Sequence, residues 1–249
     1  LSDPRGLVFD KSGNLYIADS GNNRVRKVGT DGIIATYAGD GTSATDGNLG
    51  QATVAGINQP VAVAVDDSGN LYIAERLGNV IRKVTSGGII STVAGTGTAG
   101  TPSAETGVAT SQRLYWPAGL AMQSDGSLLI ADSGNSRIRR LTTDGTITTV
   151  AGSKSAGDAG DGGAATSAVL KNPTGVAIDT NGNIYIADTA NSRVRLVGAD
   201  GGQIAHLHQC GAVAVQDDHR SFRVESHSQA HGAGAAHGAD LIKMLRTIG

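Results

Sequence analysis

An acidic side chain recurs four times in this chain of 249 residues, each time after a short apolar run of the form Leu/Ile-x-Ile-Ala. The four members of the set are Asp19, Glu75, Asp132 and Asp188. Arginines follow within seven residues, as Arg24 and Arg26 follow Asp19. Such carboxylates could bind metal or transfer protons, but a catalytic site needs unlike residues with unlike pKa values, and copied positions do not supply them. We therefore interpret them as structural groups that cap a turn and pair with the arginines.

Other residues that could act in catalysis or bind a metal are sparse in the repeated part of the chain. All six histidines and the one cysteine, Cys210, fall between His206 and His237, where nothing fixes them on a rigid element as a metal site requires. The acidic stretch at residues 158–162 offers too few oxygen ligands for calcium. We predict no catalytic residue, no bound cofactor and no metal site in the repeats.

Basic side chains gather in the third apolar run of every repeat, which together hold half of the 20 lysines and arginines. A basic stripe of this kind could bind RNA. However, no aromatic residues lie between the basic ones to stack on bases, 22 acidic residues offset them, and the net charge is −2. We expect no nucleic-acid partner, with RNA binding kept as an alternative.

The informative positions are those where one repeat departs from the others. The second repeat reads Glu75-Arg76-Leu77-Gly78 where the others read Asp, Ser or Thr, any residue, and Asn. The only tryptophan, Trp116, precedes the third repeat together with an arginine and a tyrosine. Trp, Tyr and Arg are enriched at binding hot spots, so we predict a surface for a protein or a small ligand. The predicted surface consists of Glu75, Arg76, Leu77, Arg113, Tyr115 and Trp116. The alternative is that Trp116 packs beneath its own linker.

These positions belong to a unit that is copied along the chain. The stretch PTGVAIDTNGNIYIADTANSRVRLV at residues 173–197 recurs with its prolines at Pro4, Pro60 and Pro117. Each copy has four short apolar runs separated by turn signals such as Ser-Gly-Asn and Asp-Gly, which predicts four antiparallel strands per unit. The first two runs are apolar on both faces, as at residues 61–65. This pattern is typical of strands whose two faces are both covered by other parts of the protein. We predict an all-β fold, a β-propeller of four-stranded blades, with a stacked solenoid as the alternative.

Long linkers rich in Gly, Ala, Ser and Thr follow the fourth run, at residues 39–59, 95–116 and 152–172. Each has an Ala-Thr pair at the same distance before the next proline, which indicates an ordered crossover with one helical turn. In an up-down-up-down blade, the second run ends on the side where the first begins. The residues at which the second repeat and the linker at 95–116 differ from the other copies should therefore lie close together, on the side that carries the linkers.

The predicted domain boundary lies near residue 205. We predict propeller blades over residues 1–205, with units beginning near residues 4, 60, 117 and 173. Residues 206–249 form an atypical tail, either a decayed fifth unit or a frameshifted terminus.

The chain lacks an initiator Met, so we expect a fragment or a processed product. No apolar run approaches the roughly 20 residues that span a bilayer, and we predict no membrane segment.

The repeats resemble NHL repeats, through the segments at residues 175–179, 182–188 and 191–195. The long linkers look like those of the bacterial variety of this family. The resemblance implies a propeller that usually has six blades, of which four are evident here, and it favours an extracytoplasmic or secreted location. NHL-type propellers host protein binding, RNA binding and, in related propellers, metal-assisted lyase or lactonase chemistry.

From these observations we predict a non-enzymatic module that binds a protein or a ligand through the face with the long linkers. One alternative is a metal-dependent lyase or lactonase whose ligands lie on further blades. The other is an RNA-binding NHL domain.

Overall fold

The computed structural model describes residues 1–153 and 155–207, and it confirms the predicted all-β fold of four antiparallel sheets. Blade 1 consists of β1 (Pro4–Phe9), β2 (Leu15–Asp19), β3 (Arg24–Val28) and β4 (Ile34–Ala38). Blade 2 consists of β5 (Pro60–Val65), β6 (Leu71–Glu75), β7 (Val80–Val84) and β8 (Ile90–Ala94). Blade 3 consists of β10 (Pro117–Met122), β11 (Leu128–Asp132), β12 (Arg137–Leu141) and β13 (Thr146–Ala151). Blade 4 consists of β14 (Gly175–Ile178), β15 (Ile184–Asp188), β16 (Arg193–Val197) and β17 (Ile204–His206).

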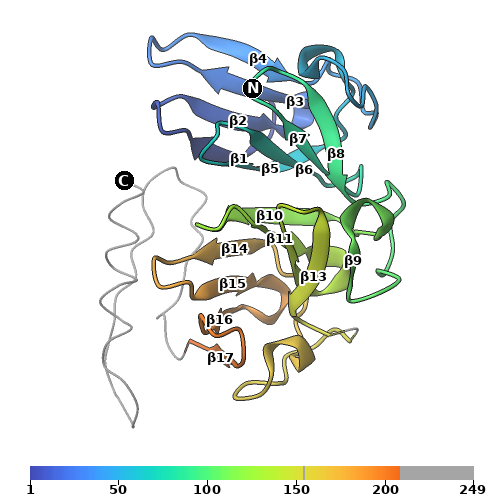
Figure 1. Ribbon diagram of the computed structural model, residues 1–249, viewed down its shortest axis with the longest axis vertical. Helices are drawn as coiled ribbons and strands as arrows, with labels where there is room; N and C mark the ends of the chain where they lie inside the picture. Colours follow the sequence, from blue (N-terminus) through green and yellow to red (C-terminus); the bar gives the residue numbers. More distant parts are fainter. Residues whose placement is uncertain (154, 208–249) are drawn as a thin grey trace. The chain divides into compact units, whose positions relative to one another are not determined.

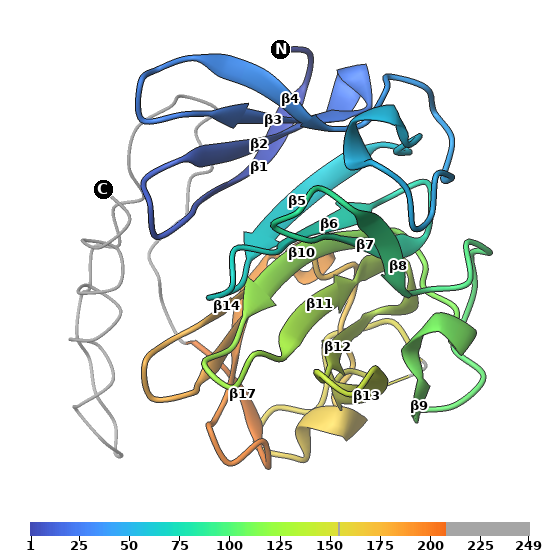
Figure 2. The ribbon, with the colours of Figure 1, turned by 45° about the horizontal axis from the view of Figure 1, so that its top comes forward.

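The strands of each blade follow one another as neighbours in the sheet, and the first strands of successive blades lie side by side. Strand β1 contacts β5, β5 contacts β10, and β10 contacts β14 (Figures 1 and 2). This radial repetition of small sheets is the arrangement of propeller blades. The blades belong to one compact unit, Leu1–Ala205. The predicted tail lies outside the described residues apart from His206 and Leu207.

The linkers are ordered, as their regular spacing predicts. Each contains one 3-10 turn at the Ala-Thr pair: η2 (Ala52–Val54), η3 (Ala109–Ser111) and η5 (Ala165–Ser167). Three further 3-10 turns follow the second strands of blades 1, 3 and 4: η1 (Ser20–Asn22), η4 (Ser133–Asn135) and η6 (Thr189–Asn191). Within the described residues, no helix is long and apolar enough to cross a membrane.

One strand was not predicted from the sequence. The linker before blade 3 forms β9 (Thr106–Val108), which pairs with β13 and adds a fifth strand to that sheet. The segment Thr-Gly-Val is too short, and too weakly apolar, to stand out from its linker. Its pairing depends on the edge of β13, which the sequence does not show.

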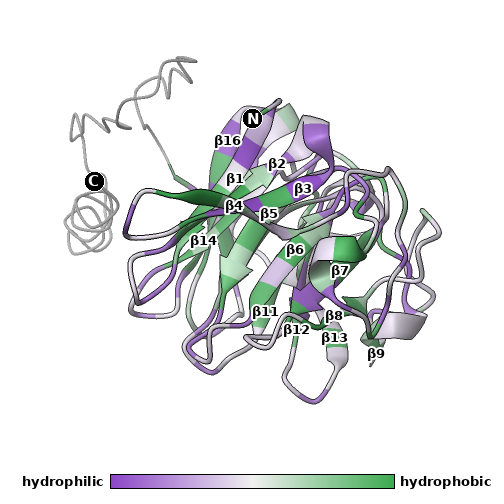
Figure 3. Ribbon diagram, turned by 90° about the horizontal axis from the view of Figure 1, so that it is seen from above, coloured by the Kyte–Doolittle hydropathy of each residue, from purple (hydrophilic) through white to green (hydrophobic). Residues whose placement is uncertain are grey.

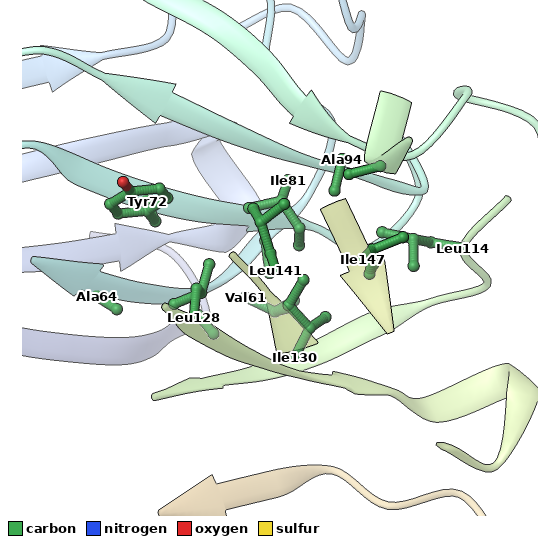
Figure 4. Close-up of a cluster of buried hydrophobic side chains, with 13 residues drawn as sticks. Val61, Ala64, Tyr72, Ile81, Ala94, Leu114, Leu128, Ile130, Leu141 and Ile147 are labelled. Atoms are coloured by element: carbon green, nitrogen blue, oxygen red, sulfur yellow. The ribbon is translucent and has the colours of Figure 1, made fainter. Parts of the chain in front are cut away.

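Where two described blades meet, the earlier one contributes an outgoing face and the later one an incoming face. Between blades 2 and 3, the outgoing face carries small side chains and one tyrosine, including Ala64, Tyr72 and Ala74. The incoming face carries large aliphatic side chains, including Leu128 and Ile130 (Figure 4). Hydrophobic residues colour stretches of the strands green in Figure 3. Fully burying one such aliphatic side chain contributes about 1.5–3 kcal/mol, so these contacts hold the blades together.

The hairpin between the first and second strands is closed by an aspartate. In blade 2, Asp66 accepts hydrogen bonds from Ser68 N (3.0 Å), Asn70 N (2.9 Å), Asn70 Nδ2 (2.8 Å) and Tyr72 Oη (3.3 Å). Partial burial acts to raise the pKa of Asp66, but these donors outweigh it and hold the pKa below its ordinary value. Asp10 and Asp179 accept the same set of bonds in blades 1 and 4.

The hairpin aspartate gives a first prediction. We expect Asp66→Ala to lower the free energy of unfolding at neutral pH by about 1–3 kcal/mol, because four donors lose their acceptor. Since the folded pKa lies below the unfolded one, the contribution of Asp66 is present at neutral pH and is lost as the pH falls through the folded value. Urea unfolding at neutral and acidic pH measures both effects.

The matched control is Asp67→Ala. Asp67 pairs with Lys11 at 2.9 Å, but its side chain is 85 % exposed, and exposed ion pairs contribute little. Equal stability of the Asp66→Ala variant and the parent protein at neutral pH would contradict the prediction.

Candidate functional site

The linker face is the end of the blades where second strands end, first strands begin and the linkers cross. Here the four repeated carboxylates are fully buried. Each accepts a hydrogen bond from the backbone N–H that lies two residues before the first strand's proline position. The bonds join Ser2 N to Asp19 Oδ1 (2.7 Å), Asn58 N to Glu75 Oε2 (3.1 Å), Tyr115 N to Asp132 Oδ1 (2.8 Å) and Lys171 N to Asp188 Oδ1 (2.7 Å). These carboxylates clamp the chain onto each blade where it enters, which agrees with the structural interpretation.

The arginines complete the clamp in two of the blades. Arg82 pairs with Glu75 at 3.0 Å and also donates to Asp46 O in the linker. Arg195 lies 3.6 Å from Asp188. All four of these paired side chains are buried, so none is placed to meet a substrate.

Burial changes the proton affinity of two of the clamp carboxylates. Desolvation raises the pKa of Asp132 to about 6, against the opposing hydrogen bonds from Tyr115 N and Asn135 and the charge of Arg139. Desolvation also raises the pKa of Glu75, which Thr45, Arg82 and Asn58 oppose. Both shifts come from the low polarity of the blade interior and do not indicate a catalytic pair.

The departures from the repeat meet on the linker face. Arg76 follows β6, and its guanidinium lies over the ring of Trp116, with Cζ 5.3 Å from the ring centroid. Trp116 immediately precedes β10, and its ring centroid lies 4.6 Å from that of Tyr115 at an interplanar angle of 47°. Trp116 is 39 % exposed and Leu77 is 50 % exposed. The structure thus brings an arginine and two aromatic rings from adjacent blades together at the surface.

The other two predicted site residues lie in different surroundings. Glu75 is fully buried beneath the face, where it clamps Asn58 and pairs with Arg82, so we assign it to the fold and not to the accessible surface. Arg113 is exposed, and its side chain lies against the backbone of Gly100. Partner binding by the exposed members of the set stays a prediction.

The backbone of Trp116 is strained for its side chain. Its φ is 51°, and the equivalent residues Asp3, Gln59 and Asn172 have φ between 45° and 53°. The left-handed region costs an ordinary residue roughly 1–2 kcal/mol and is tolerated best by Gly, Asn and Asp. Asn79 Oδ1 accepts the Trp116 N–H at 3.1 Å, so this conformation is held by the adjacent blade. The repeat imposes the conformation, and a tryptophan occupies it at a cost, which points to a role for the ring outside the fold.

A cleft of about 970 Å³ lies between blades 2 and 3 at the hairpin tips, the end of the blades opposite the linker face. Its carboxylates already have partners: Asp66 closes its hairpin, Asp125 accepts from Ser127 N and pairs with Arg140, and Asp144 accepts from Thr146 N. No three His, Cys, Asp or Glu side chains come together to hold a metal ion anywhere in residues 1–153 and 155–207. The acidic lining of the cleft therefore belongs to the turns.

Comparison with known proteins gives matches in both sequence and fold. The family model of the NHL repeat matches residues 1–28, 114–141 and 170–195. Teneurin-4 of Homo sapiens is 30 % identical over 221 residues, and Teneurin-m of Drosophila melanogaster is 29 % identical over 221 residues. Each alignment covers 79 % of this chain and 8 % of the relative, so the chain spans less than a tenth of their length. These relatives are animal proteins, so the resemblance of the linkers to those of bacterial NHL-repeat proteins stays a prediction.

Solved structures share the fold at low identity. A streptogramin B lyase has a TM-score of 0.58 at 15 % identity, over 86 % of this chain and 57 % of that one. An auxiliary nutrient binding protein from Bacteroides ovatus has a TM-score of 0.58 at 19 % identity, over 82 % of this chain and 48 % of that one. At these identities the likeness is one of fold alone.

The strain at Trp116 gives a second prediction. We expect Trp116→Asn to leave the free energy of unfolding within about 1 kcal/mol of the parent value, because relief of the left-handed strain offsets the lost cation–π contact. Asn172 shows that the repeat accepts asparagine here. Thermal and urea unfolding test this, with Gln59→Asn, at the same position before blade 2, as the control. A loss of more than about 2 kcal/mol would make Trp116 a packing residue of its linker, as burial of a large side chain provides stability of that order.

The buried Asp132 gives a third prediction. Its pKa of about 6 lies above the ordinary 3.8, so the folded state binds this proton more tightly than the unfolded chain, and stability falls as the pH rises between those values. Asp132→Asn cannot titrate. The stability of the Asp132→Asn variant, measured as its free energy of unfolding minus that of the parent protein, should therefore be higher at pH 7 than at pH 4.

The control for Asp132 is Asp125→Asn, which should show the opposite trend. Hydrogen bonds from Ser127 and the charge of Arg140 lower the pKa of Asp125. Its contribution to stability is therefore present at neutral pH and is lost in acid. A difference between the Asp132→Asn variant and the parent protein that stays constant with pH would contradict the assignment.

Proposed function

Because this chain is an NHL-repeat protein with a β-propeller fold, we propose that it is a non-enzymatic module that binds a protein partner on its linker face. The contact surface consists of Arg76, Leu77, Arg113, Tyr115 and Trp116. The observation that carries the proposal is the exposed Trp116 ring, held in a strained backbone conformation beneath the Arg76 guanidinium. This group interrupts an otherwise regular repeat.

The surface is organised before a partner arrives. The Arg76 N–H donates to Gln59 O at 3.0 Å, and the Trp116 N–H donates to Asn79 Oδ1 at 3.1 Å. Both side chains therefore project from backbone that is hydrogen-bonded to a neighbouring segment of the propeller. A surface of this kind loses less conformational entropy on binding than a surface on flexible loops. Trp, Tyr and Arg at its centre match the composition of hot spots.

The charge of the surface indicates the class of partner. Among the described residues, neither Arg76 nor Arg113 lies within ion-pair distance of a carboxylate, whereas Arg82, Arg137 and Arg140 all do. A guanidinium that stacks on an aromatic ring keeps its N–H edges available for a carboxylate. We infer that the partner presents an acidic side chain next to an apolar one, which would rest on Trp116 and Leu77.

The structural neighbours do not favour an enzyme. One is described as a lyase and another as a nutrient binding protein, and at 15–19 % identity they share the fold with this chain without a common site. A metal-dependent lyase or lactonase would need ligands beyond the described residues. RNA binding would need aromatic rings among the basic side chains, and Tyr115 and Trp116 belong to the linker before β10 and not to the basic third strands.

Selection of displayed peptides tests the proposal. We expect a random peptide library panned on the protein to yield sequences with Asp or Glu beside Leu, Phe or Trp. Synthetic copies of these peptides should bind at least tenfold more weakly to an Arg76→Gln, Trp116→Asn double variant, equivalent to about 1.4 kcal/mol. Their affinity should also fall as salt is raised, because the pairs are at the surface.

The control variant is Ile33→Asn, which removes an apolar side chain that is 66 % exposed at the opposite end of blade 1. It should bind the selected peptides as the parent protein does. Equal binding by the folded double variant would overturn the assignment of the surface. Selection of basic peptides would overturn the inferred charge of the partner.

A further inference from the structure

The cleft of about 970 Å³ between blades 2 and 3 has an apolar and aromatic wall that the hairpin turns do not use. The Tyr72 ring comes from blade 2, and Leu128 and Leu141 come from blade 3 (Figure 4). Lys83 and Val93 of blade 2 also line the cleft. A cleft of a few hundred to about 1,000 Å³ with such a wall and a small number of polar groups is typical of small-molecule binding.

The tyrosine and the lysine of this wall also occur as a pair in blade 1. Tyr72 and Lys83 are cross-strand partners in blade 2, as Tyr16 and Lys27 are in blade 1. The lysine Nζ lies 5.3 Å from the tyrosine ring centroid in blade 2 and 5.4 Å from it in blade 1. The hairpin aspartate accepts a hydrogen bond from the tyrosine Oη in both blades, at 3.3 and 3.2 Å. Both blades therefore hold the tyrosine and the lysine in the same arrangement.

In blade 1 a second aromatic ring completes this arrangement. Tyr37, from the fourth strand, packs edge-on against Tyr16, with ring centroids 4.8 Å apart at an interplanar angle of 78°. Lys27 Nζ lies 6.0 Å from the centroid of the Tyr37 ring. Both rings belong to the packing between blades 1 and 2. Edge-to-face rings and a cation over an aromatic face are favourable contacts, so the tyrosine and lysine of blade 1 form a site that an aromatic ring fills.

Blade 2 has Val93 at the position of Tyr37. Each of the two residues is followed by an alanine, Ala38 or Ala94, that pairs with the second residue of the third strand. The valine lacks the aromatic ring, while the tyrosine and the lysine of the site are kept. Val93 lines the cleft, so the cleft opens where the ring of Tyr37 fills the space in blade 1.

The facing wall from blade 3 does not close this space. Leu141 and Met122 occupy the positions of the smaller Val84 and Val65 of blade 2, and both line the cleft. Blade 3 has Leu129 in place of the tyrosine on its own outgoing face. Among the three interfaces between the described blades, the open tyrosine–lysine site therefore occurs once.

We propose that this cleft binds a small molecule with a phenol-like aromatic ring, which takes the place that the Tyr37 ring holds in blade 1. The ring packs edge-on against Tyr72, lies beside the Lys83 ammonium and rests on Val93. The cleft is larger than one ring, so the ligand has room for polar substituents that reach exposed hydroxyl side chains at the mouth, such as Thr143. This site lies at the opposite end of the blades from the linker face, and it does not depend on the linker-face proposal.

Titration with p-cresol, the analogue of the tyrosine side chain, tests the proposal by NMR. Met122 is one of two methionines in the chain and lines the cleft, so its ¹³C-labelled methyl group reports the entry of an aromatic ring. The Met122→Leu variant assigns the signal. We expect p-cresol to shift the Met122 methyl signal in a saturable manner. The saturated analogue 4-methylcyclohexanol should bind about two- to fivefold more weakly, because it has no aromatic face for the lysine.

Two substitutions in the cleft give the sharper result. Val93→Tyr supplies the ring that blade 1 has at this position, and it should weaken p-cresol binding at least about tenfold because a filled site leaves no room for the ligand. Lys83→Met should weaken binding about two- to fivefold through the lost cation–π contact. The matched controls are Ile33→Tyr, at an exposed position away from the cleft, and Lys27→Met, at the filled site of blade 1. Both controls should bind p-cresol as the parent protein does, and circular dichroism checks the fold of each variant.

Three results would overturn the inference. The first is a Met122 methyl signal that p-cresol does not shift up to its limit of solubility. The second is a folded Val93→Tyr variant that binds p-cresol as tightly as the parent protein. The third is equal affinity for p-cresol and 4-methylcyclohexanol, which would exclude recognition of an aromatic ring. If Val93→Tyr does not fold, equal p-cresol binding by the Lys83→Met and Lys27→Met variants would overturn the inference in its place.

Discussion

The buried carboxylate at the end of each second strand is the constraint from which the linker face follows. It accepts the N–H of the residue that is about to enter the first strand, over a constant separation of 17 residues in all four blades. This bond fixes where each long linker must end. The next residue has a left-handed φ in all four blades, and in blade 3 its ring lies beneath Arg76 of blade 2. The position of Trp116 is a consequence of Asp132.

Every blade has a carboxylate at this position, so the variation is limited to the length of its side chain and to the residues beside it. In blade 2 the clamp is a glutamate, and its extra methylene lets it reach Arg82 at 3.0 Å and Thr45 at 2.7 Å as well as the linker N–H. The turn that follows is freed from the Ser-Gly-Asn pattern and presents Arg76 and Leu77 outward. The buried glutamate and the arginine that follows it are adjacent in the chain, and both depart from the repeat. This is why a buried residue and a surface residue stood out together in the sequence.

The repeat made most of the fold predictable, because periodicity alone specifies four strands, tight turns and an ordered linker per unit. The convergence of Arg76, Tyr115 and Trp116 also followed from topology, since second strands end where first strands begin. Three features could not be predicted. The burial of Glu75 depends on linker atoms distant in sequence, the pairing of β9 depends on an unfilled sheet edge, and the Trp116 N–H finds its acceptor on Asn79 of the adjacent blade. Each depends on a contact between residues distant in the sequence, whereas the periodicity of the repeat predicts only local structure.

The asymmetry of the blade faces limits how the blades can pack on one another. At the interface between blades 2 and 3, small side chains such as Ala64 and Ala74 lie against the large aliphatic side chains of Leu128 and Ile130. Two faces of large side chains in contact would leave voids and lower the packing density on which apolar contacts depend. Each blade must therefore meet the next one in the same sense, and the first strands of successive blades lie side by side throughout the described propeller.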